Sequence, residues 1–189
     1  MSEHGLDLAQ LAELMRQRRT IALFDDRPVA RELVMQAIEV ARWAPNHHVT
    51  EPWHFYLLGP RGRERMVELV RQVATLKKGE KAGEFKAQSA AEVPGWIIVT
   101  CRRSADSVMQ REDYAACACA IQNLALYLWQ AGVGCKWSTG HVLQAPGLAE
   151  VAGYDGTAEE PVAIIRYGYP RVIPQQTRRD LDDIVSAVD

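Results

Sequence analysis

The sequence predicts an α+β fold in which a β-sheet is flanked by helices. Segments with apolar residues at helical spacing are interspersed with short apolar runs of strand length along the chain. A third observation concerns the turns: no glycine-rich turn joins an early strand to a helix, as a dinucleotide-binding Rossmann domain would require. We therefore expect a sheet with flanking helices rather than a doubly wound nucleotide-binding fold.

The composition suits one domain with a substantial core, spanning residues 1–189, since 48% of the 189 residues are hydrophobic. The net charge of -2, from 22 basic and 24 acidic residues, gives no general attraction to nucleic acid or anionic lipid. No apolar run reaches the roughly 18 residues that a membrane span needs. The N-terminal sequence MSEHGLDLAQLAELM lacks the basic and apolar regions of a secretion signal, so we expect a cytoplasmic protein.

Apolar residues at spacings of three and four predict four helices. These helices cover residues 7–17, 30–43, 61–75 and 112–131. The last is apolar nearly all round, so it should be buried on most sides, inside the domain or at a subunit interface. Strands are expected at residues 53–58, 96–101, 135–140 and 161–170. The nearly continuous apolar run 96–101 is typical of a buried central strand.

Two further features leave alternatives open. The polar segment 76–90 contains two glycines and could be a solvated connector, a broken helix or a lid over a cofactor. The four cysteines form no CxxC pair and no zinc-finger spacing, so we expect buried, reduced thiols. No metal site is expected, since HExxH is absent and two adjacent histidines do not suit one helical face.

Basic residues gather at two places that could hold a phosphate. Arg18, Arg19 and Thr20 follow the first predicted helix, and Arg178 lies near the C-terminus. A phosphate monoester carries nearly two negative charges and is bound by two or three charge-assisted donors, which guanidinium groups supply in pairs. Arginines at a helix end can equally bind the last carbonyls of that helix. The spacing alone leaves both interpretations open.

The loop APNHHVTEPWHF, residues 44–55, could contact the polar edge of a planar heterocycle through Asn46 or His47. Alternatively, its two prolines stiffen a turn in which Asn46 makes a local hydrogen bond. Trp43 and Trp137 could pack on the same heterocycle, or they could belong to the core.

Taken together, these motifs resemble the FMN-dependent nitroreductase family, and in particular its compact bacterial NAD(P)H nitroreductase-like members. The matching features are an RRS-like start at Arg18, the AP-x-H…PW-x-F loop, a G-x-G-x-x-W segment ending at Trp137, and a late G-Y-P strand end at residues 168–170. Their order and intervals fit from about residue 10 to 185. No single motif is specific, but four in the right order are.

The resemblance implies one nitroreductase-like domain with a central, mostly antiparallel sheet, paired in an intertwined homodimer with FMN at the interface. FMN contacts from one chain would come from Arg18, Arg19, Thr20, Trp137, Ser138, Thr139 and Arg178. Trp43 and His47 would come from the partner chain, with Asn46 in the same loop. Four positions depart from the family pattern: Thr20 replaces serine, Asn46 aspartate, Trp43 arginine and Gln176 lysine.

The implied activity is a ping-pong, two-electron transfer from NADH or NADPH to a nitroaromatic, quinone or similar small-molecule acceptor. No catalytic side chain is expected, since the flavin N5 carries the hydride chemistry. Arg19 or Lys136 could place a cation near the flavin N1 and O2. The alternatives are another flavin reaction, such as flavin cleavage or dehalogenation, non-enzymatic flavin binding, or a helical interaction module without a cofactor.

Overall fold

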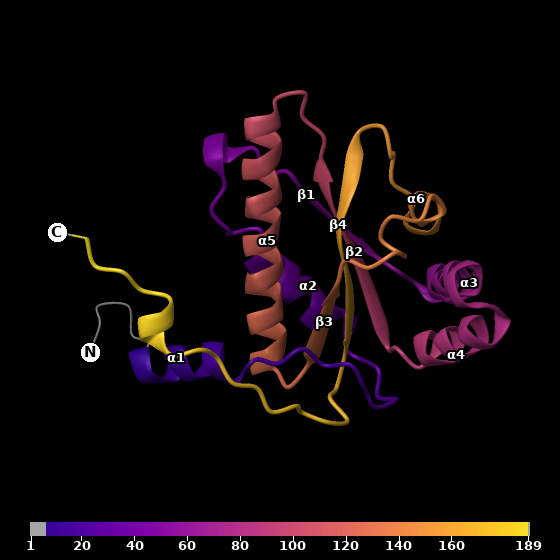
Figure 1. Ribbon diagram of the computed structural model, residues 1–189, viewed down its shortest axis with the longest axis horizontal. Helices are drawn as coiled ribbons and strands as arrows, with labels where there is room; N and C mark the ends of the chain where they lie inside the picture. The colour runs from indigo at the N-terminus through magenta and orange to yellow at the C-terminus, as the bar shows by residue number, and fades with distance from the viewer. Residues whose placement is uncertain (1–6, 189) are drawn as a thin grey trace.

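The computed structural model describes residues 7–188 and contains a four-stranded sheet with helices on both faces (Figure 1). The strand order is β1-β2-β4-β3, and each neighbouring pair is antiparallel. The strands are β1 (Trp53–Leu57), β2 (Gly95–Arg102), β3 (Gly134–Ser138) and β4 (Glu159–Gly168). The predicted α+β class and antiparallel sheet are confirmed. The N-terminal segment in which a secretion signal was sought lies partly outside the described residues.

Six α-helices and two short 3-10 helices complete the described part of the chain. They are α1 (Leu8–Gln17), α2 (Arg31–Ala41), η1 (His47–Val49), α3 (Pro60–Lys78), α4 (Glu80–Ala91), α5 (Ser107–Gln130), α6 (Leu148–Ala152) and η2 (Leu181–Asp183). Helix α5 begins five residues before its predicted start, because the Asp106 carboxylate caps it by accepting from the Val108 N–H at 2.8 Å. Between residues 7 and 188, no helix is both long and apolar enough to cross a membrane.

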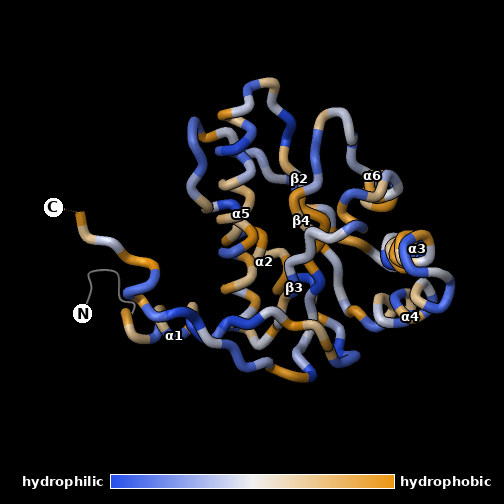
Figure 2. Tube along the Cα trace, viewed as in Figure 1, coloured by the Kyte–Doolittle hydropathy of each residue, from blue (hydrophilic) through white to orange (hydrophobic). Residues whose placement is uncertain are grey.

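The sheet separates two apolar layers, because successive residues of a strand face opposite sides. On β2, Ile97 and Val99 pack with α2 and α5, whereas Trp96 and Ile98 pack with α3 and α6. Figure 2 shows apolar residues along the central strands β2 and β4 and within the helices beside them. Every residue of β2 before Arg102 is buried, so the prediction of a buried central strand is confirmed.

Segment 76–90 is a broken helix, and most of its residues are exposed to solvent. Helix α3 continues to Lys78, Gly79 turns the chain at a φ of +84°, and α4 returns antiparallel to α3 (Figure 1). The two helices approach closely at Gly83, where an added Cβ would lie 2.0 Å from the Thr75 hydroxyl oxygen. Only one face of this polar segment is packed, through Gly83, Ala87 and Ala90, and most of its other residues are exposed.

The prediction that all four cysteines are buried is wrong for one of them. Cys101, Cys117 and Cys135 are buried, whereas Cys119 is exposed, and all four are free. Helix α5 packs one face on the sheet, so a residue two positions after buried Cys117 turns to the outer side.

Helix α1 and the C-terminal tail carry apolar surface that one chain does not bury. Leu8 is 74% exposed and Met15 is 53% exposed, and α1 has no buried residue. In Figure 1, α1 projects from the body of the molecule, as does the end of the tail. Further exposed apolar side chains of the tail are Val172, Ile173, Leu181, Ile184, Val185 and Val188. Apolar patches on a protein surface mark interaction sites, so we expect these two segments to contribute to one.

Candidate active site

The chain after α1 is fixed between the edge strand β3 and the residues that follow β4. Thr20 forms a parallel bridge with Cys135, and the Ile21 N–H donates to the Cys135 carbonyl at 3.0 Å. The Asp25 N–H donates to the carbonyl of Tyr169 at 2.9 Å. These bonds place the Arg18–Thr20 motif beside β3 and the start of the C-terminal tail.

Two adjoining cavities of about 520 and 120 Å³ lie at this place. They share Arg18 and Gln122, so a ligand could extend from one into the other. The larger is lined by Met15, Arg16, Arg18, Arg19, Gln122, Gln176 and Arg178. The smaller is lined by Arg18, Thr20, Ile121, Gln122, Ala125, Cys135, Trp137 and Ile165. The structure thus brings five of the candidate residues, which are distant along the chain, to these two cavities: Arg18, Arg19, Thr20, Trp137 and Arg178.

The larger cavity is cationic, since four arginines line it and none of the acidic residues between positions 7 and 188 does. Arg19 donates to the carbonyls of Arg16 and Arg18, so this side chain caps the end of α1 as the alternative interpretation expected. Arg18 is partly buried and forms no ion pair with a carboxylate of residues 7–188. An anionic group with several acceptor oxygens suits this set of donors.

The smaller cavity is narrow and mainly apolar, with the Trp137 ring and Ile165 among its walls. Burial raises the pKa of the Cys135 thiol to about 12, although the nearby Arg18 charge opposes the shift, so the thiol stays protonated and neutral at pH 7. Pockets that enclose a drug-sized ligand measure roughly 300–1,000 Å³. The 120 Å³ here can receive one edge of a planar ring but cannot enclose it, which leaves an open side for another surface to cover.

The loop with Trp43, Asn46 and His47 is anchored at the other end of α5. His47 Nδ1 lies 2.8 Å from a Glu112 carboxylate oxygen, and the Thr50 hydroxyl donates to buried Asp113 at 2.5 Å. The Asn46 side-chain oxygen accepts from the Glu51 N–H at 2.9 Å, and this bond spans five residues and closes the loop.

The conformation of this loop is strained and presents an aromatic side chain outward. His48, Val49 and Glu51 have φ values of +56°, +52° and +43°, a region that non-glycine residues seldom adopt. Trp43 is 75% exposed. Backbone strain of this kind persists where the surrounding structure enforces it, and it clusters at functional sites.

One chain does not bring this loop to the arginines. Glu112 anchors the loop and Gln122 lines the arginine cavity, and ten residues of α5 correspond to about 15 Å along the helix axis. In Figure 1, the loop lies beside one end of α5, whereas α1 lies near the other end. Contact between Trp43 or His47 and the arginine cavity would therefore require a second copy.

Ser138 and Lys136 face away from the arginine cavity. Both line a third cavity on the α3–α4 side of the sheet, because side chains alternate along β3 and Trp137 takes the opposite face. The Ser138 side chain is thus not among the groups that line the predicted site, and contact there would involve its backbone. Thr139 directly follows β3. Of the two cations considered for the flavin N1 and O2, Arg19 lines the arginine cavity and Lys136 lines the third cavity.

Sequence reasoning missed the contribution of α5 to the site. Ile121, Gln122 and Ala125 line the smaller cavity from this helix. Gln122 is a polar residue within the apolar stretch that was expected to be buried, and that exception was the available signal.

Comparison with known proteins agrees with this geometry. The sequence pattern of the Nitroreductase family matches residues 15–169. The chain belongs to the nitroreductase family. A Bacillus subtilis relative, provisionally named NAD(P)H nitroreductase YfhC, is 32% identical over 174 residues, which is 89% of each chain.

Solved nitroreductase structures share the fold. A nitroreductase-like family protein from Bacillus cereus superimposes with a TM-score of 0.86 at 28% identity, covering 95% of this chain and 96% of the other. A provisionally named nitroreductase from Desulfovibrio desulfuricans, solved with FMN, has a TM-score of 0.75 at 22% identity over 95% of this chain and 96% of its own. The family predicted from the sequence motifs is confirmed.

Proposed function

We propose that this nitroreductase-family chain is a homodimeric, FMN-dependent oxidoreductase. It takes electrons from NADH or NADPH and reduces a nitroaromatic, quinone or similar acceptor in two-electron steps, by a ping-pong mechanism. The observation that carries the proposal is the position of Arg18, which joins a cationic cavity to a narrow apolar one. A phosphate tail and a flat ring of one molecule match this pair.

The lining residues fit FMN by their chemistry. Arg18 and Arg178 would hold the phosphate, with the Gln176 amide where many relatives carry lysine. Trp137 would lie against the ring, and the Thr20 hydroxyl would serve the ribityl chain or pyrimidine edge. Bound FMN would supply the hydride chemistry, with NAD(P)H as its electron donor.

The residues of this chain act by position and charge. The arginines neutralise the phosphate, and the bonds of Thr20 and Ile21 to β3 hold them in place before a ligand arrives. Trp137 and Ile165 exclude water from one edge of the ring. The partner subunit's Trp43 and His47, with Asn46 of the same loop, would cover the open side.

Homodimer formation is supported by surface that the single chain leaves uncovered. The outer side of α5 exposes small and polar residues, among them Ala115, Cys119 and Gln122. Exposed apolar residues of α1 and the tail lie to the same side of the molecule in Figure 1. A second copy packed there would bury these surfaces and bring its strained loop to the arginine cavity. The single domain over residues 1–189 and the cytoplasmic location stay predictions.

A charge placed in this interface is expected to separate the subunits. Cys119→Arg puts a guanidinium on the outer face of α5, where a tightly packed partner leaves no room for its hydration. Sedimentation velocity should show a dimer for the native chain and a monomer for the variant, with FMN lost on dialysis. Ala91→Arg on exposed α4 is the matched control and should remain dimeric. A monomeric native chain would contradict the dimer.

The proposed activity has a direct spectroscopic test. Purified protein should be yellow or should bind added FMN, and NADH or NADPH should bleach the flavin absorbance under anaerobic conditions. Addition of a nitroaromatic or a quinone should restore the absorbance. Protein that binds FMN but is not bleached by either nucleotide would favour non-enzymatic flavin binding. Protein that refuses FMN would overturn the proposal.

A further inference from the structure

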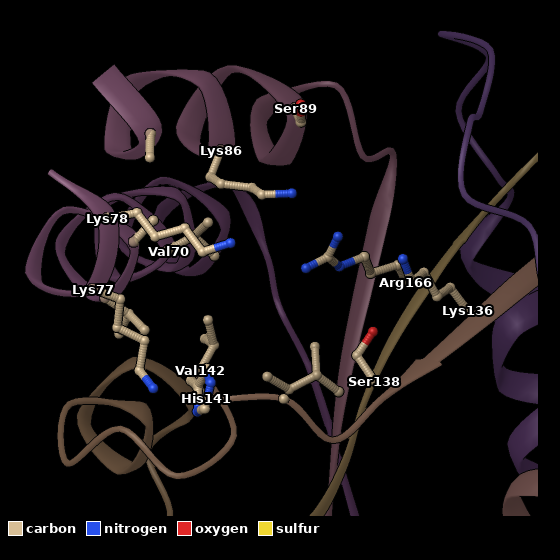
Figure 3. A pocket seen from close by; sticks show the side chains of 15 residues that line it. Val70, Lys77, Lys78, Lys86, Ser89, Lys136, Ser138, His141, Val142 and Arg166 are labelled. Carbon is tan, nitrogen blue, oxygen red and sulfur yellow. The ribbon is translucent and has the colours of Figure 1, made fainter. Parts of the chain in front are cut away.

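A third cavity lies on the α3–α4 side of the sheet, opposite the face that carries Trp137 and α5. Its volume is about 350 Å³, and it is bounded by the α3–α4 helix pair, by β3 and β4, and by the loop after β3. The proposed FMN contacts do not require it, apart from the backbone near Ser138. Figure 3 shows the side chains that line it.

The charged groups of this cavity are all basic. Its lining includes Lys77, Lys78, Lys86, Lys136 and Arg166, and no acidic residue of the described part of the chain. Among residues 7–188, no carboxylate forms an ion pair with any of these five. In Figure 3, Lys86 extends from α4 toward the Arg166 guanidinium on the opposite wall. Cations that face each other without an intervening anion repel, so this arrangement favours a bound negative group.

Two buried polar atoms at the same wall lack partners. The Ser138 hydroxyl oxygen and Arg166 Nε are both inaccessible to solvent and form no hydrogen bond with protein groups. Figure 3 shows the Ser138 hydroxyl and the Arg166 side chain directed into the cavity. A buried donor without a partner is energetically costly, so such atoms usually have a partner when the protein is fully assembled with its ligands.

The pKa of Lys136 agrees with a cluster of positive charges that no anion neutralises. Burial lowers the pKa of its ammonium group, and the charges of Arg166 and Lys86 lower it further. Burial also lowers the pKa of the Arg166 guanidinium, whose face lies 4.8 Å from the Trp96 ring centroid. Both groups are held in the wall rather than released to solvent.

The remaining walls define the rest of the ligand. They are apolar and come from α3, β4 and the loop after β3, through Val70, Val73, Ala74, Val142 and Ile164. A fully hydrated inorganic anion would leave these walls without contacts, whereas an anion with a hydrocarbon body would cover them. A cavity of this size is at the lower end of those that bind small organic molecules.

We propose that this cavity is a second ligand site, which binds a small organic carboxylate with an apolar or aromatic body. The carboxylate would accept from the Lys86 ammonium group and from the terminal N–H groups of the Arg166 guanidinium, and the body would lie between α3 and Val142. The site is separate from the arginine cavity and does not depend on the proposed flavin chemistry.

Benzoate is a suitable probe, and its neutral isostere benzamide is the control ligand. Isothermal titration of the full chain, with and without saturating FMN, should show benzoate binding at least roughly 10-fold more tightly than benzamide. Lys86→Met should weaken benzoate binding by about 3- to 10-fold, and Arg166→Met by more. Lys81→Met, on the same helix but outside the cavity, should leave the affinity unchanged.

Three results would overturn the proposal: equal affinity for benzoate and benzamide, no effect of Lys86→Met, or displacement of benzoate by FMN. The last would place benzoate in the arginine cavity. Because Arg166 is partly buried and its variant could fail to fold, the exposed Lys86 decides the outcome. Failure of FMN binding with intact benzoate binding would reject the flavin function alone.

Discussion

Replacing Arg18 with alanine is expected to weaken FMN binding by roughly 30- to 1,000-fold, or about 2–4 kcal/mol. Arg18 lines both the cationic and the apolar cavity, is partly buried, and has no carboxylate partner within residues 7–188. Its charge is thus available to a phosphate, and no other residue described here combines both positions with a positive charge. Equilibrium titration of the apoprotein with FMN, followed by fluorescence quenching, gives the ratio.

Two further variants separate a local charge effect from a general one. Arg178→Ala should lower the affinity less, because Arg178 lines only the larger cavity and is exposed. Arg179→Ala removes the neighbouring charge, which lines neither cavity, and should change little. Similar losses for Arg178→Ala and Arg179→Ala would indicate non-specific attraction. An unchanged FMN affinity in Arg18→Ala would refute the phosphate assignment.

Gly134→Ala is expected to lower the free energy of unfolding by about 1–3 kcal/mol and to weaken FMN binding as well. A Cβ at this position would lie 2.3 Å from Ile21 Cγ1 and 3.1 Å from Pro170 Cγ. The methyl group would push residues 20–21 off β3, and these are the residues that set the position of Arg18. Urea denaturation and FMN titration of the same preparation measure both effects.

Gly140→Ala is the matched control, because no atom lies within 4 Å of a Cβ built there. It should change stability by no more than roughly 0.5 kcal/mol. A Gly134→Ala chain with native stability and native FMN affinity would show that residues 20–21 have room to move. The coupling between the strand edge and the arginine motif would then be absent.

Much of this architecture could be read from local patterns. The apolar run 96–101 predicted the buried strand β2, because a strand covered on both faces excludes polar residues. Helical spacing predicted α1, α2, α3 and α5. The start of α5 was missed, because it is set by the capping carboxylate of Asp106, which lies before the continuous apolar stretch. Helix α4 was missed as a distinct element, because the tertiary approach at Gly83 stabilises a segment with little apolar periodicity of its own.

The candidate site also has a part that the sequence predicts and a part that it does not. The motif at Arg18, the residue Trp137 and the late Arg178 could be chosen from the sequence, but their convergence depends on Thr20 pairing with β3. The motif does not specify the direction of each side chain. Ser138 and Lys136 were therefore assigned to the same site as Trp137, although their side chains face the opposite layer.

The sequence by itself determined the fold class, the family and the residue types available for an anionic ligand, because periodicity and motif order are properties of the chain alone. Only the tertiary structure decided which side chains share a cavity. Strand alternation and the pairing of distant segments set that choice, and neither is encoded by local spacing. For that reason the cationic cavity beside α4 could not be predicted from the sequence, since it forms only where β3, β4 and the helices α3 and α4 meet.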